Sequence, residues 1–427
     1  FSASEALAEA LRPTSSLEPA TLRQQETRDA RLLISINDSI SFQGAVDLAP
    51  LTDQTLHGMT LEASDLLAVR NTLILSRTAR RVLLDNAETA PILAAMAEGL
   101  SDGGGLIDLI NRTISERGEV LDSASPELAH IRSEIKVVHA RLMDRLNRYL
   151  TDPASSRMLQ ETLITQRSGR YVLPLRAEHK GQIKAIIHDQ SASGATLFVE
   201  PIAVVELNNK FRELELAERD EVLRVLRVLS QQIALQAEGL NLTTKAMAGI
   251  DLALMKAHYA DDLHANEPEL VPFPAQPPED HPGSIIQLRR ARHPLLDPQK
   301  VVPIDFELDR QTFSVVLTGP NTGGKTVSLK TVGLMVLMAQ AGLQIPEQSG
   351  SRLSIFSDVF ADIGDEQSIE QNLSTFSSHM VNIAGILKEI DHESLVLFDE
   401  LGSGTDPQEG SALAISILDE VIARGAR

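Results

Sequence analysis

One eight-residue segment restricts the fold of this chain most, because it matches the phosphate-binding loop pattern G-x-x-x-x-G-K-[ST]. The pattern has a mechanism where a strand leads into a helix, since backbone N–H groups then converge on a phosphate. An apolar strand is predicted over 313–318 and a helix over 327–340, so the context fits. The loop consists of Gly319, Pro320, Asn321, Thr322, Gly323, Gly324, Lys325 and Thr326.

The loop residues have distinct predicted roles. The glycines allow close approach of the backbone, Lys325 reaches the β- and γ-phosphates, and the Thr326 hydroxyl binds Mg²⁺. The alternative is a glycine-rich turn that contains a lysine by chance.

A second motif is the apolar run 394–398, which ends in Asp399 and Glu400. In phosphate-loop ATPases the carboxylate at such a strand tip belongs to the Mg²⁺ shell. The next carboxylate is placed to activate water as a general base. We therefore assign Asp399 to the metal and Glu400 to catalysis; the alternative is a solvated acidic turn.

A third segment predicts a helix from Thr375 to about Ile390, with Ser374 as its cap. A serine at a helix N-terminus is also a candidate second anion site. On this segment alone an ordinary N-cap is the simpler interpretation.

Together these segments resemble the ATPase domain of the MutS family, a branch of the ABC-type ATPases. The resemblance rests on GPNxGGKT, on the STF helix start and on DE-x-G-x-G-T-D from Asp399 to Asp406. The segment 292–296, RHPLL, is similar to the start of that domain. Segments 170–174 and 188–201 are similar to the second bacterial type of MutS protein, not to the mismatch-repair type.

The resemblance implies a multidomain α plus α/β fold, with a helical core, long lever helices, a small β clamp and an ABC-type ATPase domain. We place the helical core at 1–128, the lever helices at 129–267 with the clamp at about 160–202, and the ATPase domain at 284–427. Between them, 268–283 holds six prolines and is predicted to be a stiff linker.

The resemblance also implies a mechanism. ATP and Mg²⁺ bind at the loop, and two ATPase domains pair head to tail, so that Ser374 of one subunit faces the γ-phosphate held by the other. Glu400, Lys325 and Ser374 are then the catalytic residues. Val302 and Ile304 are candidates for contact with adenine.

The resemblance further implies a partner. It favours branched or duplex DNA and a role in limiting homologous recombination, and it equally allows stalled or collided ribosomes with their rRNA. Two other classes stay open: an ATPase subunit of a membrane transporter, and a scaffold that binds ATP without turning it over.

A histidine near the γ-phosphate and a nuclease-like domain are expected, from the resemblance, beyond Arg427. We therefore expect a chain that binds ATP, turns it over poorly and does not cut DNA.

Charge is unevenly distributed along the chain. The formal net charge is −20, which argues against nucleic acid, yet residues 129–184 carry eleven Lys or Arg against five Asp or Glu, a local +6. This basic arm is a candidate polyanion footprint, and the alternative is a solvated helix face. The arm residues that we select are Lys136, Arg141, Arg145, Arg148 and Arg170.

The cysteines, apolar runs and histidines of the sequence limit which other kinds of site and location are possible. The chain has no cysteine, which excludes disulfides and thiolate metal sites and fits a cytoplasmic protein. No apolar run reaches the length of a membrane span. His188, His293 and His379 show no paired metal-ligand spacing, and we interpret all three as structural.

Overall fold

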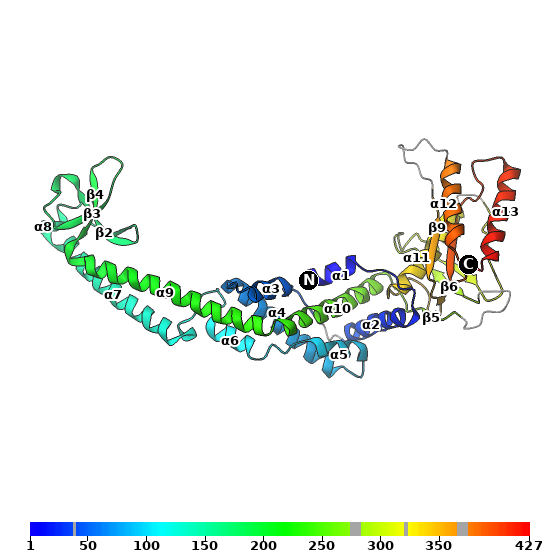
Figure 1. The fold of residues 1–427 in the computed structure, drawn as a ribbon, viewed down its shortest axis with the longest axis horizontal. Helices are drawn as coiled ribbons and strands as arrows, with labels where there is room; N and C mark the ends of the chain where they lie inside the picture. Colours follow the sequence, from blue (N-terminus) through cyan, green and yellow to red (C-terminus); the bar gives the residue numbers. More distant parts are fainter. Residues whose placement is uncertain (37–39, 274–282, 320–322, 365–374) are drawn as a thin grey trace. The chain divides into compact units, whose positions relative to one another are not determined.

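The computed structural model describes residues 1–36, 40–273, 283–319, 323–364 and 375–427. It divides into two compact units, and the chain passes between them four times (Figure 1). Unit 1 comprises 1–43, 76–100 and 243–427, and unit 2 comprises 44–75 and 101–242. This grouping differs from the boundaries predicted from the sequence, which remain predictions.

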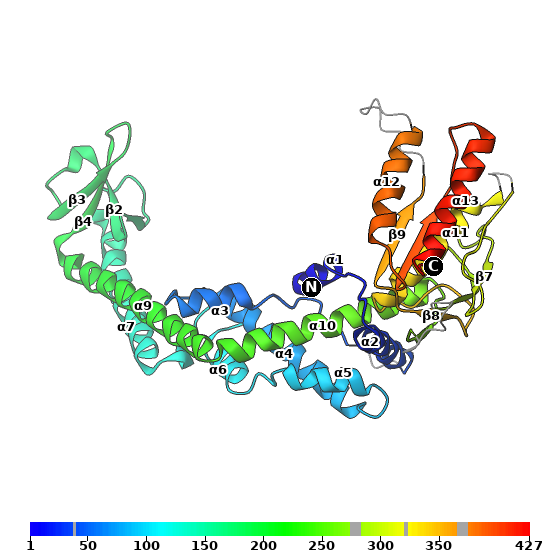
Figure 2. The same ribbon diagram turned by 45° about the vertical axis from the view of Figure 1, so that its right-hand side comes forward.

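Unit 2 is built on two long helices that pack side by side, α7 (Pro126–Thr151) and α9 (Ile202–Leu235), as both ribbon views show (Figure 2). Ser125 caps α7 by accepting a hydrogen bond from the Leu128 N–H at 3.2 Å, and Pro126 occupies its first turn. Buried side chains at helical spacing join the pair, among them Ile131, Val138 and Phe211.

A four-stranded antiparallel sheet of order β1-β2-β4-β3 lies in the chain between α7 and α9. Its strands are β1 (Thr165–Arg167), β2 (Arg170–Arg176), β3 (Ala185–Gln190) and β4 (Thr196–Pro201), and α8 (Pro153–Ser156) precedes them. Leu173, Leu175, Leu197 and Val199 from the sheet pack with Leu142 of α7 in one core. The predicted change from helix to β structure and back is therefore confirmed.

The rest of unit 2 is helical. It contains α3 (Ala49–Leu56), α6 (Leu106–Thr113) and the first part of α4 (Ala63–Asp85), which pack with the end of α9 around Leu66, Leu73 and Ile110.

Unit 1 holds two sheets and the helices around them. One sheet has the order β5-β8-β6-β7, and the other is the parallel pair β10-β9. The strands are β5 (Glu269–Val271), β6 (Ile286–Ala291), β7 (Ile304–Leu308), β8 (Arg352–Ser354), β9 (Asp358–Asp362) and β10 (Ser394–Phe398). The helices are α1 (Ser2–Glu9), α2 (Leu17–Ser35), α5 (Pro91–Met96), α10 (Ala237–Asp262, from residue 243), α11 (Lys325–Gln340), α12 (Thr375–Glu389) and α13 (Pro407–Ala423).

The core of unit 1 forms where α11 packs on both sheets. Val332, Met335 and Val336 of α11 contact Leu395 and Leu397 of β10, and the same cluster includes Ile286, Leu288 and Leu353 from the other sheet. The helices predicted over 327–340 and 375–390 and the strand over 394–398 are confirmed as α11, α12 and β10.

Two predictions about local structure are wrong. Residues 313–318, all of them described, belong to no strand, and Val316 is 62% exposed. Part of the predicted linker, Glu269–Val271, is a strand that pairs in parallel with β8, while 274–282 lie outside the described residues. The helical region that follows the four-stranded sheet is divided at Gln236 into α9 and α10.

The reasons differ. An apolar run indicates an extended, buried segment, but only pairing with a neighbour makes it a strand, and a single sequence does not reveal that neighbour. Three residues suffice for β5 because Leu270 packs against the core of unit 1 before Pro272 ends the pairing.

Candidate functional site

The predicted phosphate loop leads directly into α11. Gly324 is the N-cap of this helix with φ 80°, a left-handed conformation that glycine adopts without strain. Lys325 donates from Nζ to the main-chain oxygen of Gly319 at 2.6 Å, so the lysine folds back over the loop. Pro320, Asn321 and Thr322 lie outside the described residues.

The loop and the second motif meet through side chains. The Thr326 hydroxyl donates to Asp399 Oδ2 at 2.6 Å, and the Asp399 N–H donates to the Asp362 carbonyl at 2.9 Å. Asp399 directly follows β10, and β10 pairs in parallel with β9. A hydroxyl and a carboxylate oxygen in contact form the donor set that Mg²⁺ prefers, so these two residues fit that ion.

Glu400 follows Asp399 and is exposed. Its φ is 51°, a left-handed conformation that is uncommon outside glycine and that often marks functional sites. The next loop is held against α13, since Gly402 has φ 78° and a Cβ there would lie 2.3 Å from the Gly410 carbonyl oxygen. Asp406 caps α13 by accepting from the Gln408 N–H at 2.9 Å.

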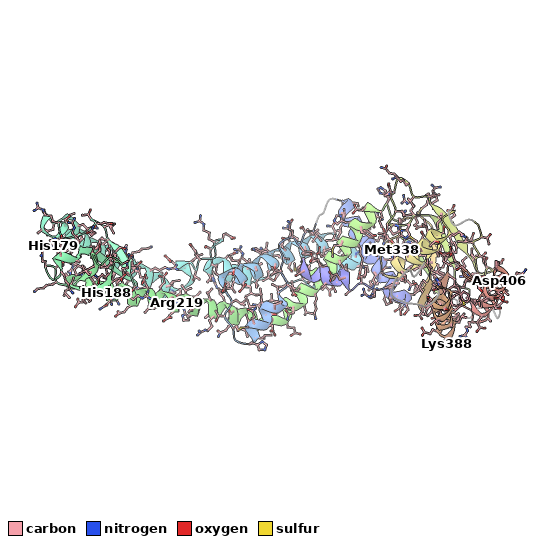
Figure 3. The ribbon with its side chains drawn as sticks, turned by 90° about the horizontal axis from the view of Figure 1, so that it is seen from above. His179, His188, Arg219, Met338, Lys388 and Asp406 are labelled. Carbon is pink, nitrogen blue, oxygen red and sulfur yellow. The ribbon has the colours of Figure 1, made fainter. Side chains whose placement is uncertain are left out.

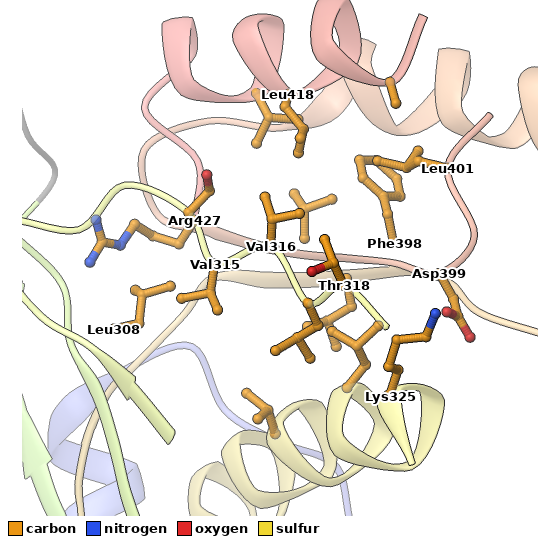
Figure 4. A pocket seen from close by; sticks show the side chains of 18 of the residues that line it. Leu308, Val315, Val316, Thr318, Lys325, Phe398, Asp399, Leu401, Leu418 and Arg427 are labelled. Carbon is orange, nitrogen blue, oxygen red and sulfur yellow. The ribbon is translucent and has the colours of Figure 1, made fainter. Parts of the chain in front are cut away.

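A cavity of about 460 Å³ in unit 1 is lined in part by Lys325, Asp399 and Glu400. Figure 4 shows Lys325 and Asp399 together at one side of it. Gly319 also lines it, and apolar side chains form most of the remaining wall. The apolar wall comes from Val315, Val316 and Leu317, from side chains of β7, β10 and α11, and from Leu418 of α13.

The structure thus brings the pair Lys325 and Thr326 together with the pair Asp399 and Glu400, although the two pairs are far apart in the sequence. Ser374 lies outside the described residues, and α12 begins at the next position. Of the candidates for adenine contact, Val302 is 79% exposed and Ile304 is the first residue of β7.

Sequence reasoning missed one polar cluster beside this site. The carboxylate of Asp362, 7% exposed, is bonded to two side chains of α12, His379 and Asn382, each at 2.8 Å. The spacing of His379 and Asn382 on one helix was the available signal, but their acceptor is distant in the sequence.

The predicted basic arm maps onto α7 and the sheet of unit 2. Lys136, Arg141, Arg145 and Arg148 are exposed on α7, and the last three share a face because they are four and three residues apart. Arg148 pairs with Asp144 at 2.8 Å, and Arg145 donates to the Ala203 carbonyl at 2.9 Å. Arg141 forms no ion pair with any residue within the described ranges.

Arg170 is engaged inside the sheet region instead. Its guanidinium lies 2.9 Å from Glu200 Oε1, and Glu200 is fully buried. The same carboxylate contacts His188 Nε2 at 2.6 Å and accepts from Asn208 at 2.7 Å. Figure 3 shows His188 in this β-rich part of unit 2. A buried carboxylate requires such partners, so Arg170 has a structural role whether or not it meets a ligand.

Comparison with known proteins identifies the family. Residues 315–426 match the family described as MutS domain V. The whole chain is 47% identical to "Endonuclease MutS2" of Thermomicrobium roseum, and 98% of it is 48% identical to "Endonuclease MutS2" of Geobacillus kaustophilus. The chain belongs to the MutS family.

This MutS-family chain spans about half the length of these curated relatives, 54% and 53% respectively. The matched family segment contains Lys325, Thr326, Asp399 and Glu400. Among the described residues, no helix is long and apolar enough to span a bilayer, and no group of three or more His, Asp or Glu side chains is arranged to hold a metal ion.

Proposed function

We propose that this MutS-family chain is an ATP-dependent nucleic-acid clamp that binds and hydrolyses ATP in an ABC-type ATPase domain. The observation that carries the proposal is the contact between Thr326 and Asp399, beside Lys325 and Glu400. A hydroxyl from a phosphate-loop helix and a carboxylate from a strand tip meet in this way in enzymes that hold Mg²⁺ on nucleotide phosphates.

Each residue has a defined part in the proposed reaction. Backbone N–H groups at the start of α11 bind phosphate oxygens, and Lys325 exchanges the Gly319 carbonyl for the β- and γ-phosphates. Thr326 and Asp399 would hold Mg²⁺, which would supply positive charge against the charge that develops on the phosphates. Glu400 accepts a proton from the attacking water, and its exposed position leaves room for that water.

The proposed partner is branched or duplex DNA, held between the basic arms of a homodimer. Arg141, Arg145 and Arg148 on one exposed face of α7 support a phosphate contact, which positions a polyanion without reading its sequence. Phosphate contacts are the same on rRNA, so a ribosome-associated ATPase is the alternative. Mild crosslinking followed by recovery of DNA or of ribosomes distinguishes the two.

Lys325→Ala tests the nucleotide site. Lys325 is the cation of the phosphate loop, so we expect the variant to lose detectable ATP binding by calorimetry. Lys330→Ala, which removes an exposed lysine of the same helix, is the matched control and should bind ATP like the parent. Near-normal affinity in the Lys325 variant would refute the assignment of this loop.

A further inference from the structure

The proposed reaction leaves the cluster around Asp362 without a role. Asp362 is the last residue of β9, and both oxygens of its carboxylate are bonded: Oδ2 to His379 Nδ1 and Oδ1 to Asn382 Nδ2, each at 2.8 Å. Since a carboxylate only accepts hydrogen bonds, both nitrogens donate. We call these three residues the Asp362 cluster.

Both donors belong to one helix. His379 and Asn382 are three residues apart on α12, a spacing that places two side chains on the same face. Bonds to both oxygens of one carboxylate fix the helix in two directions, because sliding or rotation of α12 against β9 lengthens at least one of them. The Asp362 cluster therefore sets the position of α12 along β9.

The same aspartate is joined to the proposed metal ligand. The Asp399 N–H donates to the Asp362 carbonyl at 2.9 Å, and Phe398 is paired with Asp362 in the β9–β10 ladder. Asp399 also accepts from Thr326 at 2.6 Å. A continuous series of hydrogen bonds thus runs from the first turn of α11 through Asp399 and Asp362 to α12.

Apolar packing alone is sufficient to hold α12 against the β9–β10 sheet, so this polar cluster is not needed for that. Ile386 and Ile390 already bury the far end of the helix against Phe360 and Val396. Apolar contacts resist separation but are not directional, and a buried carboxylate is costly unless its bonds are made. The carboxylate at this position therefore provides direction and register, which apolar packing lacks.

We propose that the Asp362 cluster is a positioning device that transmits occupancy of the Thr326–Asp399 site to α12. Coordination of a metal replaces the hydrogen bond between Thr326 and Asp399, which shifts Asp399, and the paired Asp362 carries the shift to His379 and Asn382. The start of α12 moves with them. This inference rests on the proposed function, and His379 and Asn382 are positioning residues that act through Asp362.

Hydrogen exchange of the full 427-residue chain, with and without Mg²⁺ and a non-hydrolysable ATP analogue, tests the proposal. The parent should gain protection in the first turn of α11 and also in α12. His379→Ala should keep the first gain and lose the second. His379→Asn should restore it, because its Nδ2 replaces Nδ1 as donor, and the exposed His392→Ala should behave like the parent.

Turnover provides a second readout. In His379→Ala we expect kcat to fall about tenfold with KM nearly unchanged, since the variant loses placement of a group needed only in the transition state. Equal protection of α12 in His379→Ala and the parent would overturn the proposal.

Two further outcomes are also decisive. If α12 of His379→Ala already exchanges faster than the parent without nucleotide, Asp362→Asn, which keeps the side-chain size, is tested in place of that variant. A gain of protection in α12 of Asp362→Asn equal to that of the parent would overturn the proposal. A parent that gains no protection anywhere would overturn the proposed function together with this inference, whereas protection confined to α11 in the parent would overturn the inference alone.

Discussion

Two carboxyl groups of this chain, those of Glu347 and Glu400, lie in opposite environments, one buried and one exposed. Glu347, between α11 and β8, is 3% exposed, and burial raises the pKa of its carboxyl to about 8. The Ser351 backbone N–H and Arg289 oppose that rise without cancelling it. Glu400 presents the opposite case, an exposed carboxylate held at φ 51° where its side chain reaches water.

Glu347 should make the stability of the chain depend on pH. Its folded pKa of about 8 exceeds the ordinary value of 4.5, so between these values the folded state holds a proton that the unfolded state has lost. The free energy of unfolding therefore falls as pH rises through this window, by at most about 1.4 kcal/mol per pH unit. Glu347→Gln should flatten this dependence in denaturant titrations, and an unchanged slope would contradict the assignment.

The proposed site residues that the structure describes lie at the start of α11 and directly after β10. The apolar periodicity of these elements was sufficient to predict them, and the loop pattern predicted Lys325 and Thr326 at the start of α11. The pairing of strands was not predictable, because partners such as β5 and β8 lie far apart in the sequence. For the same reason the sequence did not connect Asp362 with His379, or Arg170 with Glu200.

The basic face of α7 should carry the nucleic-acid contact. Reversal of Arg141, Arg145 and Arg148 to Glu should weaken DNA binding and flatten its salt dependence, since each lost phosphate contact lowers the log–log slope by about 0.9. Fluorescence anisotropy at several salt concentrations measures that slope. Reversal of Arg77, Arg80 and Arg81 on α4 makes the same charge change as a control, and equal slopes in both triple variants would mean that α7 presents only a solvated face.

At the scale of the whole molecule, the proposed function requires two copies of the chain. The proposed composite site takes its phosphate loop from one copy and Ser374 from the other. Activity that appears only when two different variants are mixed is therefore the observation that tests this arrangement.

Mixing two inactive variants tests the composite site. Ser374→Ala and Lys325→Ala should each lack turnover, whereas one site of their mixed dimer keeps both residues intact. We expect phosphate release to reappear on mixing, by up to about a quarter of parental activity if the two chains pair at random and each site acts independently. The control mixture combines Lys325→Ala with Ser328→Ala, a serine substitution on α11 that keeps both Lys325 and Ser374. Its activity should be no higher than that of its Ser328→Ala component. Mixtures that never exceed their components would exclude action between subunits.

The central claim is that Thr326, Asp399 and Glu400 form a hydrolytic site, and single-turnover phosphate release from bound MgATP tests it most directly. Glu400→Gln should bind MgATP like the parent but release phosphate about 10² to 10⁴ times more slowly, because it removes the general base and leaves the phosphate loop and Asp399 unchanged. Release at the parental rate by a variant that still binds MgATP would contradict the account and place the base elsewhere.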